Sequence, residues 1–264
     1  MSRWTLPVVA LLLAVQQAPA RTRAVVPPDP TEDRMLLTAG FLTHHPDMKY
    51  RLLGMQAYRE KRFDDALRFF RRASFYADKP SQGMVAEMYW NGQGVPADRA
   101  LAYAWMDLAA ERGYRGFLGL RERYWAALDA TERERAVAEG EAVYARFGDA
   151  AAKPRYEFQL RTGRREMTGS RTGFNRGVQI EVPGPEGGQA IDGSKFFDER
   201  YWDAKKYWAW QDKLWMRARI GRVTVGDLQD VRRLPAAPAS RVPVVTPQAD
   251  ATPPDVPGEP ADGP

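Results

Sequence analysis

The sequence predicts an all-α protein: a short α-solenoid of stacked antiparallel helix pairs, then an irregular basic segment, one long aromatic-rich helix and a disordered Pro-rich tail. Three observations predict this fold. Apolar residues between about 33 and 148 recur at helical spacing. An alanine–aromatic pattern in that region repeats after 36 residues. Beyond residue 234, Pro, Ala, Val and Asp dominate and large apolar residues almost vanish, so this part buries too little surface to offset its chain entropy.

The first 20 residues have the pattern of a signal peptide. Arg3 precedes an apolar run from Leu6 to Val15, and Ala18-Pro19-Ala20 gives the small-x-small motif that predicts cleavage after Ala20. The run is about ten residues long, too short to cross a bilayer, and no later segment is apolar enough to do so. We therefore expect a periplasmic or secreted protein without a transmembrane segment. Residues 21–32 read as a linker because their prolines forbid helix.

Residues 33–148 are predicted to form the repeat domain. In the pattern, an alanine is followed by an aromatic residue three positions later and by a second alanine seven positions later. This spacing puts all three side chains on one helical face. The three occurrences are Ala66, Phe69 and Ala73; Ala102, Trp105 and Ala109; and Ala138, Glu141 and Ala145, where the aromatic residue is lost. Small alanines allow a neighbouring helix to approach closely, and the aromatic ring fills the space beside them.

Another helix is expected before each of these. The three segments run from Met48 to Lys61, from Gln82 to Asn91 and from Arg115 to Leu128. Asp129 and Glu132 match a capping box at the start of the last helix. A helix pair cannot bury its apolar face alone, so stacking of successive pairs into a superhelix is predicted.

The second pair resembles a Sel-one-like repeat. Residues 84–95 read Met-Val-Ala-Glu-Met-Tyr-Trp-Asn-Gly-Gln-Gly-Val and match the first helix and turn, and residues 96–113 match the second helix and its glycine stop. Gly92 and Gly94 suit the tight turn, Asp98 suits a helix start and Gly113 suits the position after a helix. Residues 53–67 are closer to a tetratricopeptide repeat, and the third pair departs further, as a capping repeat would. The resemblance implies an adaptor or scaffold, a role that exported bacterial members often have at the cell envelope, and it brings no catalytic residues.

The composition limits the kinds of catalytic and metal-binding site that the chain can form. The chain has no cysteine, which excludes disulfides, thiolate catalysis and cysteine-ligated metals. Its two histidines, His44 and His45, are adjacent and precede Pro46, so they are expected in a loop or at a helix start rather than as metal ligands. Residues 188–195 approach a P-loop, but Ser194 and Lys195 stand in the wrong order, so we expect a flexible loop. We predict no catalytic residue, metal or cofactor; an enzyme would need a carboxylate pair that the sequence does not place.

Residues 149–193 are predicted to be an irregular, glycine-rich basic connection. Arginines are interleaved with aromatic residues here, and Arg161, Arg164 and Arg165 are candidates for holding an anionic envelope polymer. The other interpretation is a solvated arm packed along the solenoid. Nucleic acid is not expected as a partner of a signal-bearing protein. Residues 177–183 alternate and predict a short strand.

Residues 194–233 are predicted to be helical and to pack on the repeats. An aromatic stripe follows helical spacing through Phe197, Tyr201, Trp208 and Trp215. Such a stripe usually belongs to the core, and packing against the repeat stack is the favoured interpretation. The alternative is a partner-binding face, because Trp and Tyr are enriched in interfaces. Residues 234–264 form the expected disordered tail.

The sequence thus predicts an exported, non-enzymatic repeat scaffold that mediates protein–protein interaction in the cell envelope by binding a protein or peptide. The alternative is a cell-wall-associated factor that binds glycan or modulates a wall hydrolase through its basic stretch and exposed aromatic residues. The partner-binding candidates are Tyr58, Tyr89, Tyr124, Tyr201, Trp208, Trp215, Arg161, Arg164 and Arg165.

Overall fold

The computed structural model of the chain describes residues 30–33, 36–37, 40–168, 179–182, 189–216 and 239–258. The predicted signal peptide at 1–20, most of the linker at 21–32 and residues 217–238 lie outside this set. None of the helices in the described part combines the length and the apolar character of a bilayer span.

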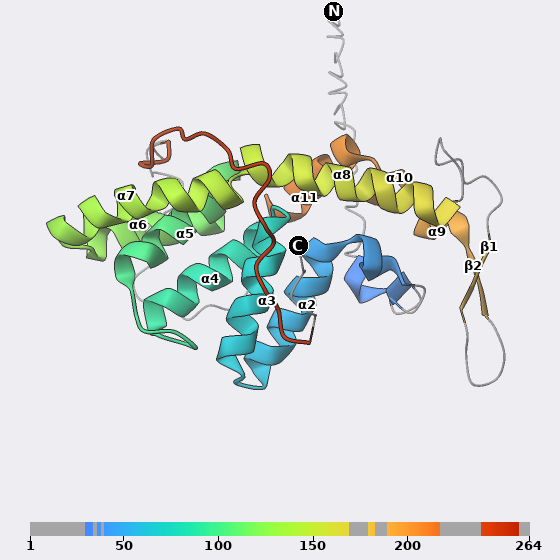
Figure 1. Cartoon of the computed structure of the whole chain (residues 1–264), viewed down its shortest axis with the longest axis horizontal. Helices are drawn as coiled ribbons and strands as arrows, with labels where there is room; N and C mark the ends of the chain where they lie inside the picture. The colour runs from blue at the N-terminus through green and yellow to red at the C-terminus, as the bar shows by residue number, and fades with distance from the viewer. Residues whose placement is uncertain are drawn as a thin grey trace, which may run out of the picture.

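The repeat domain consists of three antiparallel helix pairs, as predicted (Figure 1). Short 3-10 turns η1 (Pro30–Glu32) and η2 (Phe41–His44) precede the pairs, and η3 (Ala110–Arg112) follows the second one. The pairs are α2 (Pro46–Arg59) with α3 (Phe63–Phe75), α4 (Lys79–Asn91) with α5 (Arg99–Ala109), and α6 (Arg115–Ala127) with α7 (Ala130–Phe147). The main core lies between the two helices of each pair and between successive pairs.

Local signals set the helix ends where the sequence predicts them. The carboxylate of Asp98 accepts from the backbone N–H of Leu101 at 3.0 Å and caps α5. Asp129 and Glu132 form the predicted capping box of α7, with bonds of 2.8 and 2.9 Å. Gly94 has a φ of +69°, and a Cβ built there would lie 2.5 Å from the backbone of Phe63. Only glycine fits at that point, because the α4–α5 turn lies against the start of α3.

The alanine–aromatic pattern is buried in α3 and α5 but not in register in α7. Ala138 and Glu141 are exposed, Ala145 is buried as predicted, and Ala136, Gly140 and Val143 are buried as well. Ala136 and Val143 follow Ala102 and Ala109 by 34 residues, whereas Ala145 follows Ala109 by the predicted 36. The α6–α7 turn is shorter than the α4–α5 turn, so α7 starts sooner and its buried residues do not follow a single repeat step.

The predicted irregular connection at 149–193 is corrected in its first half, because α8 (Asp149–Thr168) is a long helix that only Gly148 separates from α7. Figure 1 shows α7 and α8 following one another along one side of the molecule. The helix forms because Ala151, Ala152, Tyr156 and Leu160 are buried on one face. Pro154 lies inside it and removes one backbone donor.

The predicted strand is confirmed as β1 (Gln179–Val182), which pairs antiparallel with β2 (Gln189–Asp192) so that Ile180 faces Ile191. The strand β2 and the short helix α9 (Gly193–Phe196) occupy most of the segment expected to be a flexible loop. The predicted long aromatic helix is divided, because α10 (Glu199–Trp202) and α11 (Ala204–Trp215) follow α9 as separate helices. Asp198 and Asp203 interrupt it by capping α10 and α11.

The predicted aromatic stripe is packed at Phe197 and Tyr201, which are buried, whereas its Trp208 and Trp215 are half-buried. A second core combines η2 and the start of α2 with α8 and the three short helices. Its members include Leu36, Phe41, Met48, Tyr156, Leu160, Phe196, Tyr201, Trp202, Tyr207 and Trp210. His45 lies at the start of α2, as expected, and its ring nitrogens lie 2.9 and 3.0 Å from the carbonyl oxygens of Phe41 and Tyr201.

Residues 239–258, within the tail expected to be disordered, are described as an extended segment without helix or strand that lies across α7 and α3 (Figure 1). Val242 and Val256 are buried against the repeats. The backbone N–H of Gln248 donates to the carbonyl of Ala145 at 2.7 Å. These two valines therefore bury their side chains against the repeats rather than in a core of their own, whereas Val244 is exposed. We call residues 239–258 the C-terminal strap.

Candidate partner-binding groove

The first helices of the three pairs, α2, α4 and α6, line a groove of about 580 Å³. Its walls are mainly apolar, and α11 contributes Trp215 at one side. The lining side chains that carry this apolar character are Leu52, Met55, Met84, Trp90, Phe117, Leu120, Tyr124 and Trp215. Pockets of this size with apolar walls and a few polar groups are typical of binding sites.

Close helix approach shapes the groove floor. A Cβ built on Gly83 of α4 would lie 2.7 Å from the ring of Phe117 on α6, so the missing side chain lets the two helices converge. The ring of Trp90 stacks on that of Tyr124, with centroids 4.0 Å apart. The aromatic wall is thus held rigidly by both helices, and little conformational entropy would be lost when a partner contacts it.

The two charged side chains that line the groove, Arg51 and Glu87, differ in their pairing. Arg51 donates to Asp78 at 2.7 Å, and Asp78 also caps α4 through the N–H of Ser81, so this arginine is neutralised within the wall. Glu87 is exposed and forms no ion pair with the residues that the structure describes. Burial, together with the nearby Glu87 carboxylate, raises the pKa of Tyr124 to about 12. The groove therefore offers a partner an apolar surface with one free carboxylate.

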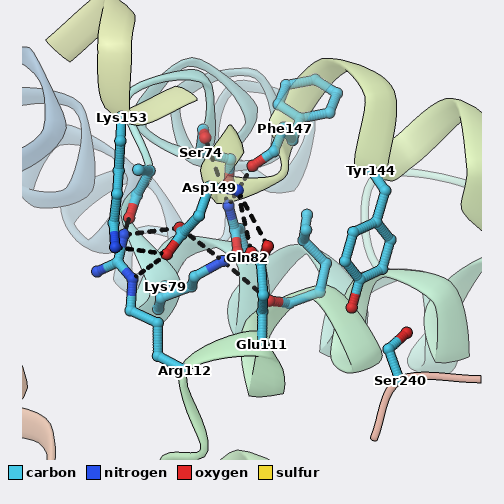
Figure 2. Close-up of polar contacts among 12 residues, drawn as sticks. Ser74, Lys79, Gln82, Glu111, Arg112, Tyr144, Phe147, Asp149, Lys153 and Ser240 are labelled. Atoms are coloured by element: carbon cyan, nitrogen blue, oxygen red, sulfur yellow. Dashed lines mark hydrogen bonds and ion pairs between the residues drawn. The ribbon is translucent and has the colours of Figure 1, made fainter. Parts of the chain in front are cut away.

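A buried ion cluster holds the repeats against α8, as Figure 2 shows. The ammonium of Lys79 donates to Glu111 at 2.5 Å and lies 3.2 Å from Asp149, although the Lys79 side chain has no exposed surface. Arg112 makes two bonds to Asp149, at 2.7 and 2.8 Å. Burial opposes ionisation of Asp149, but Lys79 and Arg112 outweigh that effect and hold its pKa well below the usual value.

The same cluster fixes the start of α8. The backbone N–H of Asp149 donates to the Glu111 carboxylate at 3.0 Å, so a side chain from η3 caps a helix 38 residues away. Gln82 donates to the carbonyl of Phe147 at 3.1 Å and ties the end of α7 to α4 (Figure 2). The charges of Lys79, Arg112, Glu111 and Asp149 are paired with one another, so the geometry of the ion cluster indicates a structural role.

The structure brings two of the nine partner-binding candidates, Tyr124 and Trp215, to the groove. Tyr58 and Tyr89 are half-buried beside the core, and the Tyr58 hydroxyl donates to Gln93 at 3.0 Å. Tyr201 is buried in the second core. Trp208 donates to Glu157 at 3.0 Å and lies beneath the charged ends of Arg112 and Lys153.

The three candidate arginines lie on the last turns of α8, away from the groove lining. Arg161 and Arg165 are exposed and Arg164 is half-buried. The groove lining also includes methionines and leucines that were not among the predicted partner-binding residues, such as Met84 and Leu120. Their helical spacing could have indicated them, but tyrosines were favoured there by residue type alone.

The comparisons with known proteins agree with this architecture. Residues 80–114 match the Sel1 repeat, which covers α4, α5, η3 and the turn that follows. Searches of curated proteins and of solved structures give no match to the chain. Sel1 repeats are protein–protein interaction scaffolds. The chain thus contains one Sel1 repeat, at residues 80–114, and this repeat forms the central pair of three stacked helix pairs.

Proposed function

We propose that this protein is a non-enzymatic scaffold of the cell envelope that binds a protein or peptide partner in the groove of α2, α4 and α6. The observation that carries the proposal is the continuous apolar lining of that groove by all three repeats and Trp215. Solenoids expose such extended surfaces for binding, and the matched repeat belongs to an interaction family.

The chemistry of the groove favours one kind of occupant. Met55, Met84 and Leu120 present flexible or branched apolar surface, which suits apolar side chains of a partner segment. Glu87 is the charge of the groove wall without an ion pair among the described residues, so it favours a lysine or arginine on the partner. The proposed partner is therefore a segment with apolar anchors and a basic residue close to one of them.

The groove can be tested by photo-crosslinking in whole cells. A photoreactive residue replaces Leu120 in the groove and, as a control, Glu134 on the exposed face of α7. We expect a discrete crosslinked partner from position 120 that Met84→Asp abolishes and that persists at high salt. Met167→Asp is the matched control, since Met167 is exposed on α8 and outside the groove. Equal crosslinking from both positions would contradict the proposal.

Export is supported by the sequence of residues 1–20 and is tested by the mature N-terminus. We expect intact-mass analysis of the protein from the envelope fraction to give a chain beginning at Arg21. A full-length chain recovered from the cytoplasm would show that this segment does not act as a cleaved signal.

A second candidate function is binding of a cell-wall glycan, or of a wall hydrolase that acts on it, through α8. Phe158 is 62% exposed, and Arg161 and Arg165 are exposed on the same helix. This function predicts co-sedimentation with purified cell wall that falls steeply with salt and is weakened by Arg161→Gln with Arg165→Gln. Groove variants such as Met84→Asp would leave it unchanged, which separates the two functions.

A further inference from the structure

Arginines gather where the C-terminal strap crosses α3 and α7. Arg71 and Arg72 come from α3, Arg146 from α7 and Arg155 from α8, and the Nε atom of each is buried without a hydrogen bond. Arg68, one turn before Arg72, is exposed beside them. Neighbouring guanidinium groups that are partly removed from water repel one another, so a bound anion would stabilise this gathering.

The acceptors that these guanidinium groups find are backbone carbonyls. Arg72 donates to Pro254 at 2.8 Å, Arg146 to Thr252 at 2.6 Å and Arg155 to Gln248 at 3.0 Å. Within the described part of the chain, no carboxylate lies within ion-pair distance of Arg68, Arg71, Arg146 or Arg155. Carbonyl dipoles orient a guanidinium group but do not neutralise it.

Repulsion between neighbouring arginines contributes to lowering the pKa values of Arg146 and Arg155. Burial and the neighbouring Arg71 lower the pKa of Arg146. Burial, and then Arg146, lower the pKa of Arg155 to about 10. Both shifts mean that the site disfavours its own positive charge, and a bound anion would relieve that repulsion.

Aromatic faces hold three of these arginines in place. Arg155 lies over Phe75 at 3.9 Å, Arg146 over Phe147 at 5.4 Å and Arg72 over Tyr50 at 5.5 Å. A guanidinium group stacked on a ring is already ordered, so it loses less entropy when it binds a ligand.

A hollow of about 670 Å³ lies between α3, α7 and the strap, and Arg68, Arg71 and Arg146 line it. Asp64 and Asp255 are the carboxylates in its wall, and neither forms an ion pair with these arginines. The hollow is larger than one small ion and has space for the rest of a ligand. It lies against α3 and α7, whereas the partner-binding groove lies against α2, α4 and α6.

We propose that this hollow binds a phosphate-bearing ligand, held by Arg68, Arg71 and Arg146. Phosphate fits better than a single carboxylate, because three guanidinium groups offer more donors than two carboxylate oxygens accept in good geometry. The ligand would join α3, α7 and the strap, since Arg68 and Arg71 come from α3 and Arg146 of α7 also donates to the strap carbonyl of Thr252.

The probe is inorganic pyrophosphate, titrated calorimetrically into the full mature chain. We expect Arg71→Gln and Arg68→Gln each to weaken binding about tenfold or more. Arg115→Gln, which removes an exposed arginine on α6, should bind like the wild type. Equal affinity in all four proteins, or no heat at millimolar pyrophosphate, would overturn the proposal.

Thermal unfolding gives a second readout that a purely structural role of Arg71 would not produce. Without ligand, Arg71→Gln should unfold at the same temperature as the wild type or a higher one, because a like charge is removed. With pyrophosphate, only the wild type and Arg115→Gln should gain stability. If Arg71→Gln gains as much as the wild type, the ion is held elsewhere and the proposal is wrong.

Vesicles distinguish the source of the phosphate. Co-sedimentation with phosphatidylglycerol vesicles that is lost in Arg71→Gln would identify a lipid headgroup as the ligand. Pyrophosphate binding without vesicle binding would identify a free phosphorylated molecule.

Discussion

Val242 of the C-terminal strap packs so closely on Gly140 of α7 that a Cβ at position 140 would lie 2.5 Å from its Cγ2 atom. The two residues are far apart in the sequence, and the absence of a side chain at 140 is what lets the strap lie against the helix. Around this contact, Ser240 donates to Asp107, and Arg241 binds Glu122 at 2.7 Å.

Gly140→Ala should release the strap without unfolding α7, because the extended strap yields more easily than a helix. We expect limited proteolysis to cut residues 239–258 faster than in the wild type, while circular dichroism stays helical. The control is Gly119→Ala in α6, where an added Cβ meets nothing within 4 Å. That variant should gain roughly 1 kcal/mol of stability from helix propensity and keep the wild-type cleavage rate. Unchanged protection of the strap in Gly140→Ala would contradict the contact.

Gly94 and Gly113 both have positive φ angles, +69° and +73°, but different surroundings. A Cβ at Gly94 would meet the Phe63 backbone at 2.5 Å, whereas one at Gly113 would meet nothing within 4 Å. Gly113→Ala should therefore cost about 1 kcal/mol for its backbone conformation alone. Gly94→Ala should cost about 2–4 kcal/mol, because the overlap with backbone atoms adds to it. Urea unfolding of the two variants measures the difference, and equal losses would show that the turn can move away from α3.

Asp149→Asn should strongly destabilise the protein at neutral pH, because it leaves Lys79 and Arg112 buried without their shared carboxylate. A loss of about 3–5 kcal/mol is expected from breaking a buried pair. Since the folded pKa of Asp149 is depressed, its stabilising effect is present above the unfolded pKa of about 3.9 and is lost as pH falls further.

Urea unfolding at pH 7 and at pH 3 measures this dependence, and the gap between wild type and Asp149→Asn should narrow at pH 3. The control is Glu139→Gln, which removes an exposed ion pair with Arg135. It should cost at most about 0.5 kcal/mol at either pH. A loss in Asp149→Asn no larger than in the control would show that the cluster contributes little.

Asp47 should give the opposite pH dependence. It is buried, accepts from the Tyr207 hydroxyl, and leaves its Oδ1 atom without a partner. Burial, then the nearby Asp78, raise its pKa to about 7. A raised folded pKa means that stability is full below the unfolded pKa of about 3.9 and is lost as pH rises towards 7, by about 1.4 kcal/mol for each pKa unit.

Asp47→Asn removes that titration, so its melting temperature should vary less between pH 4 and pH 7 than that of the wild type. At pH 8 we expect the variant to be the more stable of the two. Melting curves recorded from pH 4 to pH 8 would test this, and parallel curves for both proteins would mean that Asp47 ionises normally.

The sequence predicted the elements whose signals are local. Asp98, Asp129 and Gly94 act through bonds or contacts that follow from the turn in which they stand. The end of α4 at Asn91 and the start of α5 after Asp98 were therefore predicted, whereas α4 begins at Lys79, three residues before the predicted Gln82. In the third pair, the 36-residue repeat predicted most of the buried positions wrongly. The turn before α7 is shorter, so the residues that α7 buries do not follow a constant repeat length.

The helix α8 and the strap were not predicted because their stability comes from distant parts of the chain. The start of α8 is capped by Glu111, and its buried Tyr156 packs against Tyr207. Likewise the strap depends on Gly140 and on carbonyl contacts from Arg72 and Arg146. Neither Pro154 nor the proline-rich composition of the strap reveals these partners.

The sequence predicted the helices that form the groove, but it did not predict which side of each helix is exposed there. Tyr58 and Tyr89 pack beside the core, while Met84 and Leu120 line the groove. The angle between neighbouring pairs decides which apolar residue in the first helix of each pair remains accessible. That angle is set by contacts such as Gly83 with Phe117, which lie in different repeats.

The second core has an evolutionary consequence. It joins η2, at the start of the stack, to α8 and α10, beyond its end. Open solenoids change length by duplication or loss of a unit, because each unit contacts only its neighbours. Here an inserted helix pair would carry α8 away from Phe41 and expose both halves of that core. New binding specificity in this lineage should therefore arise by substitution within a surface of fixed length, not by gain of repeats.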